Sequence, residues 1–196
     1  MVTTYILAGG NDRSTAGYGE RLSGEIARNV TNPTILSCFF SYPAEEWEAK
    51  AQDWQPWFAD YFGSDVRYDY ARKETFLEQI DQADVIYLHG GDTRLLFDTL
   101  PSADALKEHF KGKVIVGSSA GANVLSKNYW SSKRAVPARG LGIVNSNIMV
   151  HYGGLQHEGL TRVPDDWKRE EAAFQKFIGD EQITRLPEGQ FVLVQA

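Results

Sequence analysis

Short apolar segments alternate with longer amphipathic ones along most of the chain. Several apolar segments lack polar alternation, which is typical of strands covered on both faces. They predict strands at Thr4–Ala8, Thr34–Phe39, Val66–Tyr70, Val85–Leu88, Lys113–Gly117, Asn147–Val150, Gln182–Arg185 and Phe191–Val194. The amphipathic segments predict helices at Glu20–Val30, Ala44–Phe62, Thr75–Gln82, Arg94–Leu100, Ala103–Phe110, Ala120–Lys127 and Asp166–Ile178.

This alternation of strands and helices predicts an α/β fold with a mainly parallel sheet and helices on both faces. The last two strands are close together in the sequence, so we expect a hairpin through Pro187, Glu188 and Gly189. Aromatic residues at helical spacing usually pack, so Trp47, Trp54 and Trp57 predict a core or homodimer contact more than a substrate cleft.

The composition narrows the class of protein. A chain of 196 residues with 42% apolar residues suits one α/β domain, residues 1–196. A net charge of -6 argues against a nucleic-acid or anionic-membrane partner. The single cysteine, Cys38, lies in an apolar segment and predicts a buried thiol. The sequence shows neither a membrane span nor a signal peptide, so we expect a cytoplasmic protein.

The segment Gly117–Gly121, with the sequence Gly-Ser-Ser-Ala-Gly, carries the strongest chemical signal. It follows a predicted strand and precedes a predicted helix, which is the context of a nucleophile elbow. Such a turn presents Ser119 above the carboxyl edge of the sheet, close to free N–H groups of the helix. The structural alternative is a turn of small residues that only packs a strand against a helix.

A second glycine turn follows the strand Val85–Leu88. The N–H of Gly91 or Asp92 would lie at the same sheet edge as Ser119 and would stabilise an oxyanion. The alternative is a simple strand-to-helix turn in which Asp92 or Thr93 caps the helix. A third glycine pair, Gly9 and Gly10, ends the first strand and would shape the same cleft.

A nucleophilic serine needs a general base. His151 directly follows an apolar strand and precedes a glycine-containing loop, so it is the preferred candidate. His157 on the same loop is the second choice, and His89 beside the glycine turn is a third. His109 lies in an amphipathic helix and is expected at the surface.

Together these motifs resemble the aspartyl dipeptidase (dipeptidase E) and cyanophycinase family of serine peptidases. The resemblance covers essentially the whole chain. Its motifs are Leu7–Gly10, Gly90–Thr93, Ser118–Asn123, Gly140–Ile143 leading to His151 and Tyr152, and Leu186–Gly189. It implies a flavodoxin-like three-layer fold related to class I glutamine amidotransferases, which have cysteine at the position of Ser119.

The resemblance also implies roles for individual residues. Ser119 would be the nucleophile and His151 the base, with the N–H groups of Gly91 and Ala120 as the oxyanion hole. The residues implied to bind substrate are Asp92, Asn123 and Arg169. The alternative for Arg169 is a solvated helix residue that pairs with a nearby glutamate.

One feature departs from the family pattern. The family has an acidic residue between the serine and the histidine, whereas residues 120–150 contain neither Asp nor Glu. Asn128, a serine, or an acid from elsewhere such as Glu158 or Glu188 would then orient His151. Alternatively, the enzyme uses a Ser–His dyad, or the chain has lost its activity.

The sequence therefore predicts a serine hydrolase that cleaves small peptides, acidic ones among them, through an acyl-enzyme. No metal or organic cofactor is expected, because no metal-ligand motif such as H-E-x-x-H is present. The basic pair Lys133 and Arg134 suggests a substrate preference different from that of the relatives. The alternative function is a non-catalytic binding or regulatory protein on the same scaffold, while an esterase of the α/β-hydrolase type fits less well with so short a chain.

Overall fold

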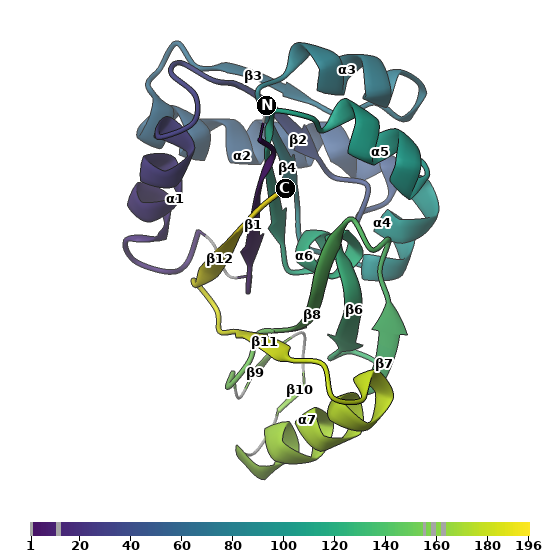
Figure 1. Ribbon diagram of the computed structural model, residues 1–196. Coiled ribbons are helices and arrows are strands. Elements are labelled where there is room, and N and C mark those ends of the chain that lie inside the picture. The colour runs from purple at the N-terminus through teal and green to yellow at the C-terminus, as the bar shows by residue number, and fades with distance from the viewer. Residues whose placement is uncertain (1, 11–12, 155, 158–159, 162–163) are drawn as a thin grey trace.

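A computed structural model of the protein describes residues 2–10, 13–154, 156–157, 160–161 and 164–196 (Figure 1). Its strands are β1 Thr4–Ala8, β2 Thr34–Cys38, β3 Arg67–Tyr70, β4 Val85–Leu88, β5 Val114–Ser118, β6 Ser126–Ser131, β7 Val136–Arg139, β8 Val144–Val150, β9 Gln156–His157, β10 Leu160–Thr161, β11 Ile183–Leu186 and β12 Phe191–Gln195. Its α-helices are α1 Tyr18–Ala27, α2 Trp47–Phe62, α3 Phe76–Gln82, α4 Thr93–Thr99, α5 Ala103–His109, α6 Ala120–Leu125 and α7 Pro164–Ile178. Two short 3₁₀ helices, Ala44–Glu46 and Lys73–Thr75, precede α2 and α3.

The main sheet has six strands in the order β12-β1-β5-β4-β2-β3. Five of these strands, β1, β5, β4, β2 and β3, are parallel to one another. The edge strand β12 runs antiparallel to its neighbour β1. Because β1, β4 and β5 are parallel neighbours, their carboxyl ends meet at one edge of the sheet, which is where α/β folds place their sites. The α/β prediction with a mainly parallel sheet is confirmed.

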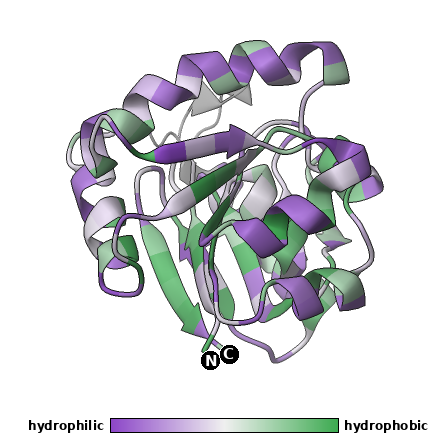
Figure 2. Ribbon diagram, turned by 90° about the horizontal axis from the view of Figure 1, so that it is seen from above, coloured by the Kyte–Doolittle hydropathy of each residue, from purple (hydrophilic) through white to green (hydrophobic). Residues whose placement is uncertain are grey.

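Both faces of the main sheet are covered. Leu22 of α1 and Phe58 of α2 pack on one face, in a cluster with Ile6, Val85 and Val116. The opposite face packs against α3 to α6 through the neighbouring positions, such as Leu7, Ile86 and Ile115. Figure 2 shows the central strands as strongly hydrophobic segments, between helices that alternate hydrophobic and hydrophilic positions. The edge strand β3, with the sequence RYDY, is hydrophilic. Successive side chains of a strand point to opposite faces, and both faces are covered, so the inner strands β1, β4 and β5 are buried at every position.

A second sheet has four strands in the order β11-β8-β6-β7 and lies below the main sheet in the view of Figure 1. One of its faces extends the core through Ile148 and Leu186, and the other packs against α7 through Trp130 and Phe174. The strands β6 and β7 were not predicted. The helix expected to reach Lys127 ends at Leu125, and the chain passes directly into β6.

The predicted hairpin between the last two strands is wrong. Ile183–Leu186 pairs in parallel with β8 in the second sheet, whereas Phe191–Gln195 pairs antiparallel with β1 in the main sheet. Pro187, Glu188 and Gly189 therefore cross from one sheet to the other. Each strand is apolar enough to join a sheet, but each gains more buried partners in a different sheet than a two-stranded hairpin offers.

Two smaller predictions concern buried side chains. Trp54 contacts Phe58, Tyr87 and His89 on one face of the main sheet, so the core interpretation of the aromatic helix is confirmed for this residue. Cys38 is fully buried, and burial raises the pKa of its thiol to about 12.

None of the described helices is long and apolar enough to cross a membrane.

Candidate active site

Ser119 occupies the turn between β5 and α6 in a strained backbone conformation. Its φ is 48° and its ψ is -103°, a region that residues with a side chain rarely adopt. Its N–H donates to Ala8 O over 3.0 Å, and its carbonyl accepts from Asn123 N over 2.9 Å. These bonds to β1 and α6 hold the strained turn in place, as expected for a nucleophile elbow.

Glycines on both sides of Ser119 allow the strand and the helix to pack closely. A Cβ on Gly121 would lie 2.1 Å from Leu88 O, and a Cβ on Gly117 would lie 2.7 Å from Gly121 C. Both distances are far below any normal contact, so neither position accepts a larger residue without moving backbone. The glycines thus set the depth at which α6 sits against β4 and β5.

His151 lies directly after β8 and faces Ser119. Its Nε2 is 2.8 Å from Ser119 Oγ, and the residue is only 4% exposed. Its N–H donates to Gly9 O over 3.1 Å, and its φ of 55° is left-handed. A Cβ on Gly10 would lie 2.3 Å from His151 Cε1, so the imidazole packs directly on the bare backbone of Gly10.

Glu188 contacts the far side of the same imidazole. Its Oε1 is 3.0 Å from His151 Nδ1. The segment that carries Glu188 is held by Gly189 N donating to Gly10 O over 2.8 Å, and by Arg21 Nη2 donating to Gly189 O over 2.6 Å. Ser119, His151 and Glu188 form one chain of hydrogen bonds, in which a carboxylate orients the imidazole and the imidazole faces the hydroxyl.

The other groups that were considered for orienting His151 are placed differently. Asn128 donates to Asn147 Oδ1 over 2.7 Å in the second sheet. Glu158 lies outside the described residues. Of the alternatives that the sequence left open, Glu188 is the one that contacts His151 in the described structure.

The remaining histidines also have defined places, with one exception. His89 is buried among Phe39, Trp54 and Tyr87, and its Nε2 is 3.0 Å from Ser37 Oγ. The pKa of His89 is lowered well below its ordinary value, mainly by burial and to a smaller extent by the positive charge of Arg13. His109 pairs with Asp81 near the surface. The side chain of His157 lies outside the described residues.

The glycine turn after β4 lies against Ser119. A Cβ on Gly90 would be 3.3 Å from Ser119 Cβ, and Gly91 lines the same pocket as Ser119. Asp92 caps α4, because its Oδ1 accepts from Arg94 N and Leu95 N. Of the two caps that the alternative interpretation named, Asp92 is the one that the structure shows. Burial raises the pKa of Asp92, but these amide bonds and the Lys133 ammonium outweigh it and the net pKa is lowered.

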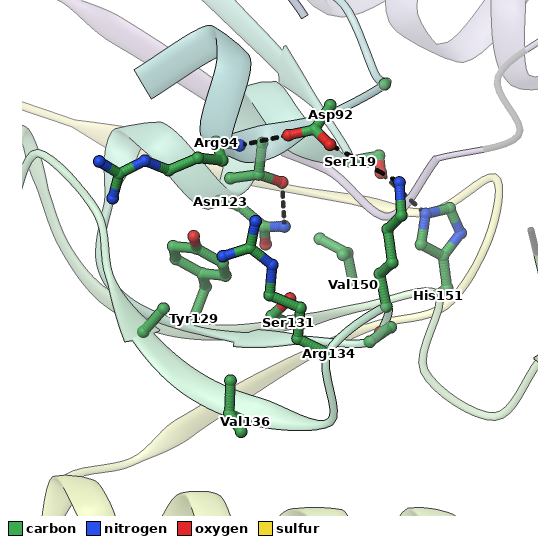
Figure 3. Close-up of a pocket in the computed structure, with 15 residues that line it drawn as sticks. Asp92, Arg94, Ser119, Asn123, Tyr129, Ser131, Arg134, Val136, Val150 and His151 are labelled. Carbon is green, nitrogen blue, oxygen red and sulfur yellow. Dashed lines mark hydrogen bonds and ion pairs between the residues drawn. The ribbon is translucent and has the colours of Figure 1, made fainter. Parts of the chain in front are cut away.

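A pocket opens beside Ser119 and His151 (Figure 3). Its walls come from the start of α4, from α6 and from the β6–β7 hairpin. Three cationic side chains line it: Arg94, Lys133 and Arg134. Arg94 pairs with Asp98, and Lys133 Nζ lies 3.6 Å from Asp92 Oδ2. These carboxylates offset part of the positive charge of the two side chains. The lining is suited to a polar ligand with negative charge.

Asn123 lines this cationic pocket. It is 5% exposed, and its Nδ2 donates to Thr93 Oγ1 over 3.2 Å. Its Oδ1 is buried and has no hydrogen-bond partner in the described part of the chain. An unsatisfied buried amide oxygen costs free energy.

Arg169 is not brought to this pocket. It lies on α7 with its side chain 79% exposed and pairs with Asp166, one turn earlier. This placement corresponds to the solvated alternative, with an aspartate as partner in place of a glutamate. Within the described residues, no group of three or more His, Cys, Asp or Glu side chains is arranged to hold a metal ion.

The sequence was compared with models of known protein families. The profile of peptidase family S51 matches residues 51–196, about three quarters of the chain, including Ser119, His151 and Glu188. The chain belongs to peptidase family S51. It is thus a serine-type peptidase, and the resemblance found in the sequence is confirmed. No curated protein sequence matches the chain significantly.

Solved structures share the fold of this S51 peptidase. A crystal structure of a peptidase from an acI-B1 actinobacterium superposes with a TM-score of 0.73 at 21% identity, over 99% of this chain and 84% of that one. A protein described as a peptidase E candidate from Listeria monocytogenes EGD-e gives a TM-score of 0.67 at 17% identity, over 100% of this chain and 95% of that one. These likenesses support the flavodoxin-like expectation at the level of the fold.

Proposed function

We propose that this S51 peptidase cleaves amide bonds of small peptides through an acyl-enzyme on Ser119. The observation that carries the proposal is the continuous chain of hydrogen bonds from Ser119 Oγ to His151 Nε2, and from His151 Nδ1 to Glu188 Oε1. A serine hydroxyl becomes nucleophilic when a neighbouring base takes its proton in the transition state.

In the proposed reaction, Ser119 Oγ attacks the scissile carbonyl and its proton passes to His151 Nε2. The carboxylate of Glu188 keeps the proton of His151 on Nδ1 and stabilises the imidazolium that forms. His151 then gives the proton to the leaving amine, and the C–N bond breaks. Water then attacks the acyl-enzyme while His151 takes its proton. The bond between the acyl group and Ser119 Oγ breaks, His151 returns the proton to Oγ, and the acid leaves.

The tetrahedral intermediate carries a negative charge on the former carbonyl oxygen. Ala120 is the first residue of α6, and its N–H has no carbonyl partner within the helix. Together with the N–H of Gly91, it would donate to this oxygen. The partial positive charge at the start of α6 acts in the same direction, although so short a helix contributes little.

We further propose that the pocket takes a small peptide with a carboxylate close to the scissile bond. Arg94, Lys133 and Arg134 line the pocket and attract the carboxylate, and Asn123 lines the same pocket beside Ser119. Asp92, which lines the same wall, offers a carboxylate to a substrate ammonium.

The test uses an active-site probe and a peptide panel. A fluorophosphonate should modify the intact protein at one site, and peptide mapping should locate the adduct on Ser119. Ser119→Ala should abolish the labelling, while Ser23→Ala, which changes a serine on α1 far from the pocket, should not. Dipeptides with Asp or Glu beside the scissile bond should release free amine faster than neutral ones.

Folded protein that is neither labelled nor able to cleave any peptide of the panel would overturn the proposal. The alternative of a non-catalytic scaffold rested on the missing acid between Ser119 and His151. With Glu188 beside His151, the described site no longer gives that alternative a specific basis.

A further inference from the structure

Ser41 is a buried residue, 2% exposed, that follows β2 and takes no part in the proposed reaction. Its hydroxyl donates to Gly90 O over 2.7 Å. Its own carbonyl accepts from Asp92 N over 3.0 Å. Ser41 therefore binds the glycine turn after β4 at both ends, on the side opposite to the one that lies against Ser119.

The peptide group between Gly90 and Gly91 needs such an external partner. Both flanking residues are glycines, so no side chain restricts the rotation of the peptide plane, and Gly91 adopts a φ of 136° that other residues rarely reach. In a trans peptide the C=O and the N–H point in opposite directions. Whatever fixes the direction of Gly90 O consequently fixes the direction of Gly91 N–H.

We infer that Ser41 is a positioning residue for the oxyanion hole. By holding Gly90 O, its hydroxyl turns the N–H of Gly91 away from Ser41 and into the pocket that Gly91 and Ser119 line. This inference rests on the proposed function, because it gives Gly91 N–H a role only if an oxyanion forms. Ser41 is not among the residues that line this pocket, so it acts through Gly91.

The packing around the turn leaves little freedom once this bond forms. A Cβ on Gly91 would lie 2.9 Å from both the carbonyl oxygen and the Oγ of Ser41. On the other side, a Cβ on Gly90 would lie 3.3 Å from Ser119 Cβ. The turn is thus in close contact with Ser41 through Gly91 and with Ser119 through Gly90. Oxyanion donors act at about 2.7–3.1 Å, so the orientation of this one peptide matters for the rate.

The experiment compares Ser41→Ala with Ser41→Thr and Ser41→Cys in the full-length enzyme. We expect Ser41→Ala to lower kcat for the best peptide of the panel, and the rate of fluorophosphonate labelling, by about 10- to 100-fold, less than the complete loss of an oxyanion donor. KM should change little. Ser41→Thr keeps a hydroxyl and should recover most of the rate, and Ser41→Cys, which keeps the volume, should be intermediate.

A matched control separates positioning from stability. Thr3 Oγ1 donates to Phe110 O over 3.2 Å at the opposite end of β1, also in the interior. The same hydroxyl accepts from Gly112 N over 3.1 Å. Thr3→Val removes both bonds far from the pocket, so it should lower the melting temperature while leaving kcat unchanged. The pH midpoint of labelling should be the same in Ser41→Ala as in the wild type, since His151 and Glu188 are untouched.

Each outcome points to one of the two claims. If the wild type is labelled and Ser41→Ala reacts at the same rate, the inference on Ser41 is wrong and the proposed function stands. The same conclusion follows if Ser41→Ala folds poorly and Ser41→Cys retains the full rate. If the wild type itself is neither labelled nor active, the proposed function fails first.

Discussion

Glu188 Oε1 lies 3.0 Å from His151 Nδ1, although 37 positions separate the two residues in the chain. The topology explains this contact. Val150 and Leu186 are paired at the ends of the parallel strands β8 and β11, so the residues that follow them emerge at the same edge of the second sheet. His151 is the first residue after β8, and Glu188 is the second after β11.

The contact leads to the first prediction. Glu188→Gln should lower kcat by about 10³- to 10⁴-fold at neutral pH, because an amide neither fixes the tautomer of His151 reliably nor stabilises its imidazolium. The measurement is steady-state turnover with the best peptide of the panel. Glu108→Gln, which changes an exposed glutamate paired with Lys111, is the charge-matched control and should keep wild-type turnover. An equally active Glu188→Gln enzyme would show that His151 works without this carboxylate.

A second prediction concerns the glycine under the imidazole. Gly10→Ala places a Cβ 2.3 Å from His151 Cε1 at a φ of 101°, so the ring must move. Displacement of a catalytic group by about 1 Å costs about 100-fold in rate, and we expect at least this loss of kcat. The control is Gly24→Ala in α1, where a Cβ meets nothing within 4 Å. That variant should keep its activity and gain about 0.5–1 kcal/mol in the free energy of unfolding.

A third prediction concerns the cations of the pocket. Arg134→Gln should raise KM for peptides with an acidic residue by about 1.5- to 5-fold, because an exposed ion pair contributes about 0.2–1 kcal/mol. The KM for neutral peptides should not change. The difference in KM for acidic peptides between Arg134→Gln and the wild type should shrink as salt is added. Lys107→Gln on α5, outside the pocket, is the control. Equal effects on acidic and neutral peptides would argue against recognition of charge by Arg134.

A fourth prediction concerns stability as a function of pH. Burial lowers the pKa of His89 in the folded state below its unfolded value of about 6.5. The unfolded chain therefore binds a proton that the folded chain rejects, and the contribution of neutral His89 is complete above pH 6.5 and is lost as the pH falls. Urea unfolding at pH 7.5 and 5.5 should show a lower free energy of unfolding at pH 5.5.

The substitution that isolates this effect is His89→Phe, which keeps an aromatic ring among Phe39, Trp54 and Tyr87. It should flatten the dependence on pH between these values. His109→Gln near the surface should leave the dependence as in the wild type. If His89→Phe loses the same amount of stability on acidification as the wild type, another group is responsible.

Local sequence was enough to predict the elbow and its neighbours. The order strand, glycine turn, serine and helix around Ser119 depends on interactions within a few residues, as does the cap that Asp92 forms on α4. The place of His151 at the end of an apolar strand was visible for the same reason. By contrast, Ser41 carried no signal, because a lone serine after a strand has no pattern that marks its partner.

The sequence by itself determined the alternation of strands and helices, the α/β class and the residues of the elbow, because these follow from periodicity and backbone sterics along contiguous segments. Only the tertiary structure decided which sheet each of the last two strands joins. That choice depends on the burial that each strand gains against β1 or β8, distant segments whose competition no local pattern records. The same choice brought Glu188 to His151 and completed the site.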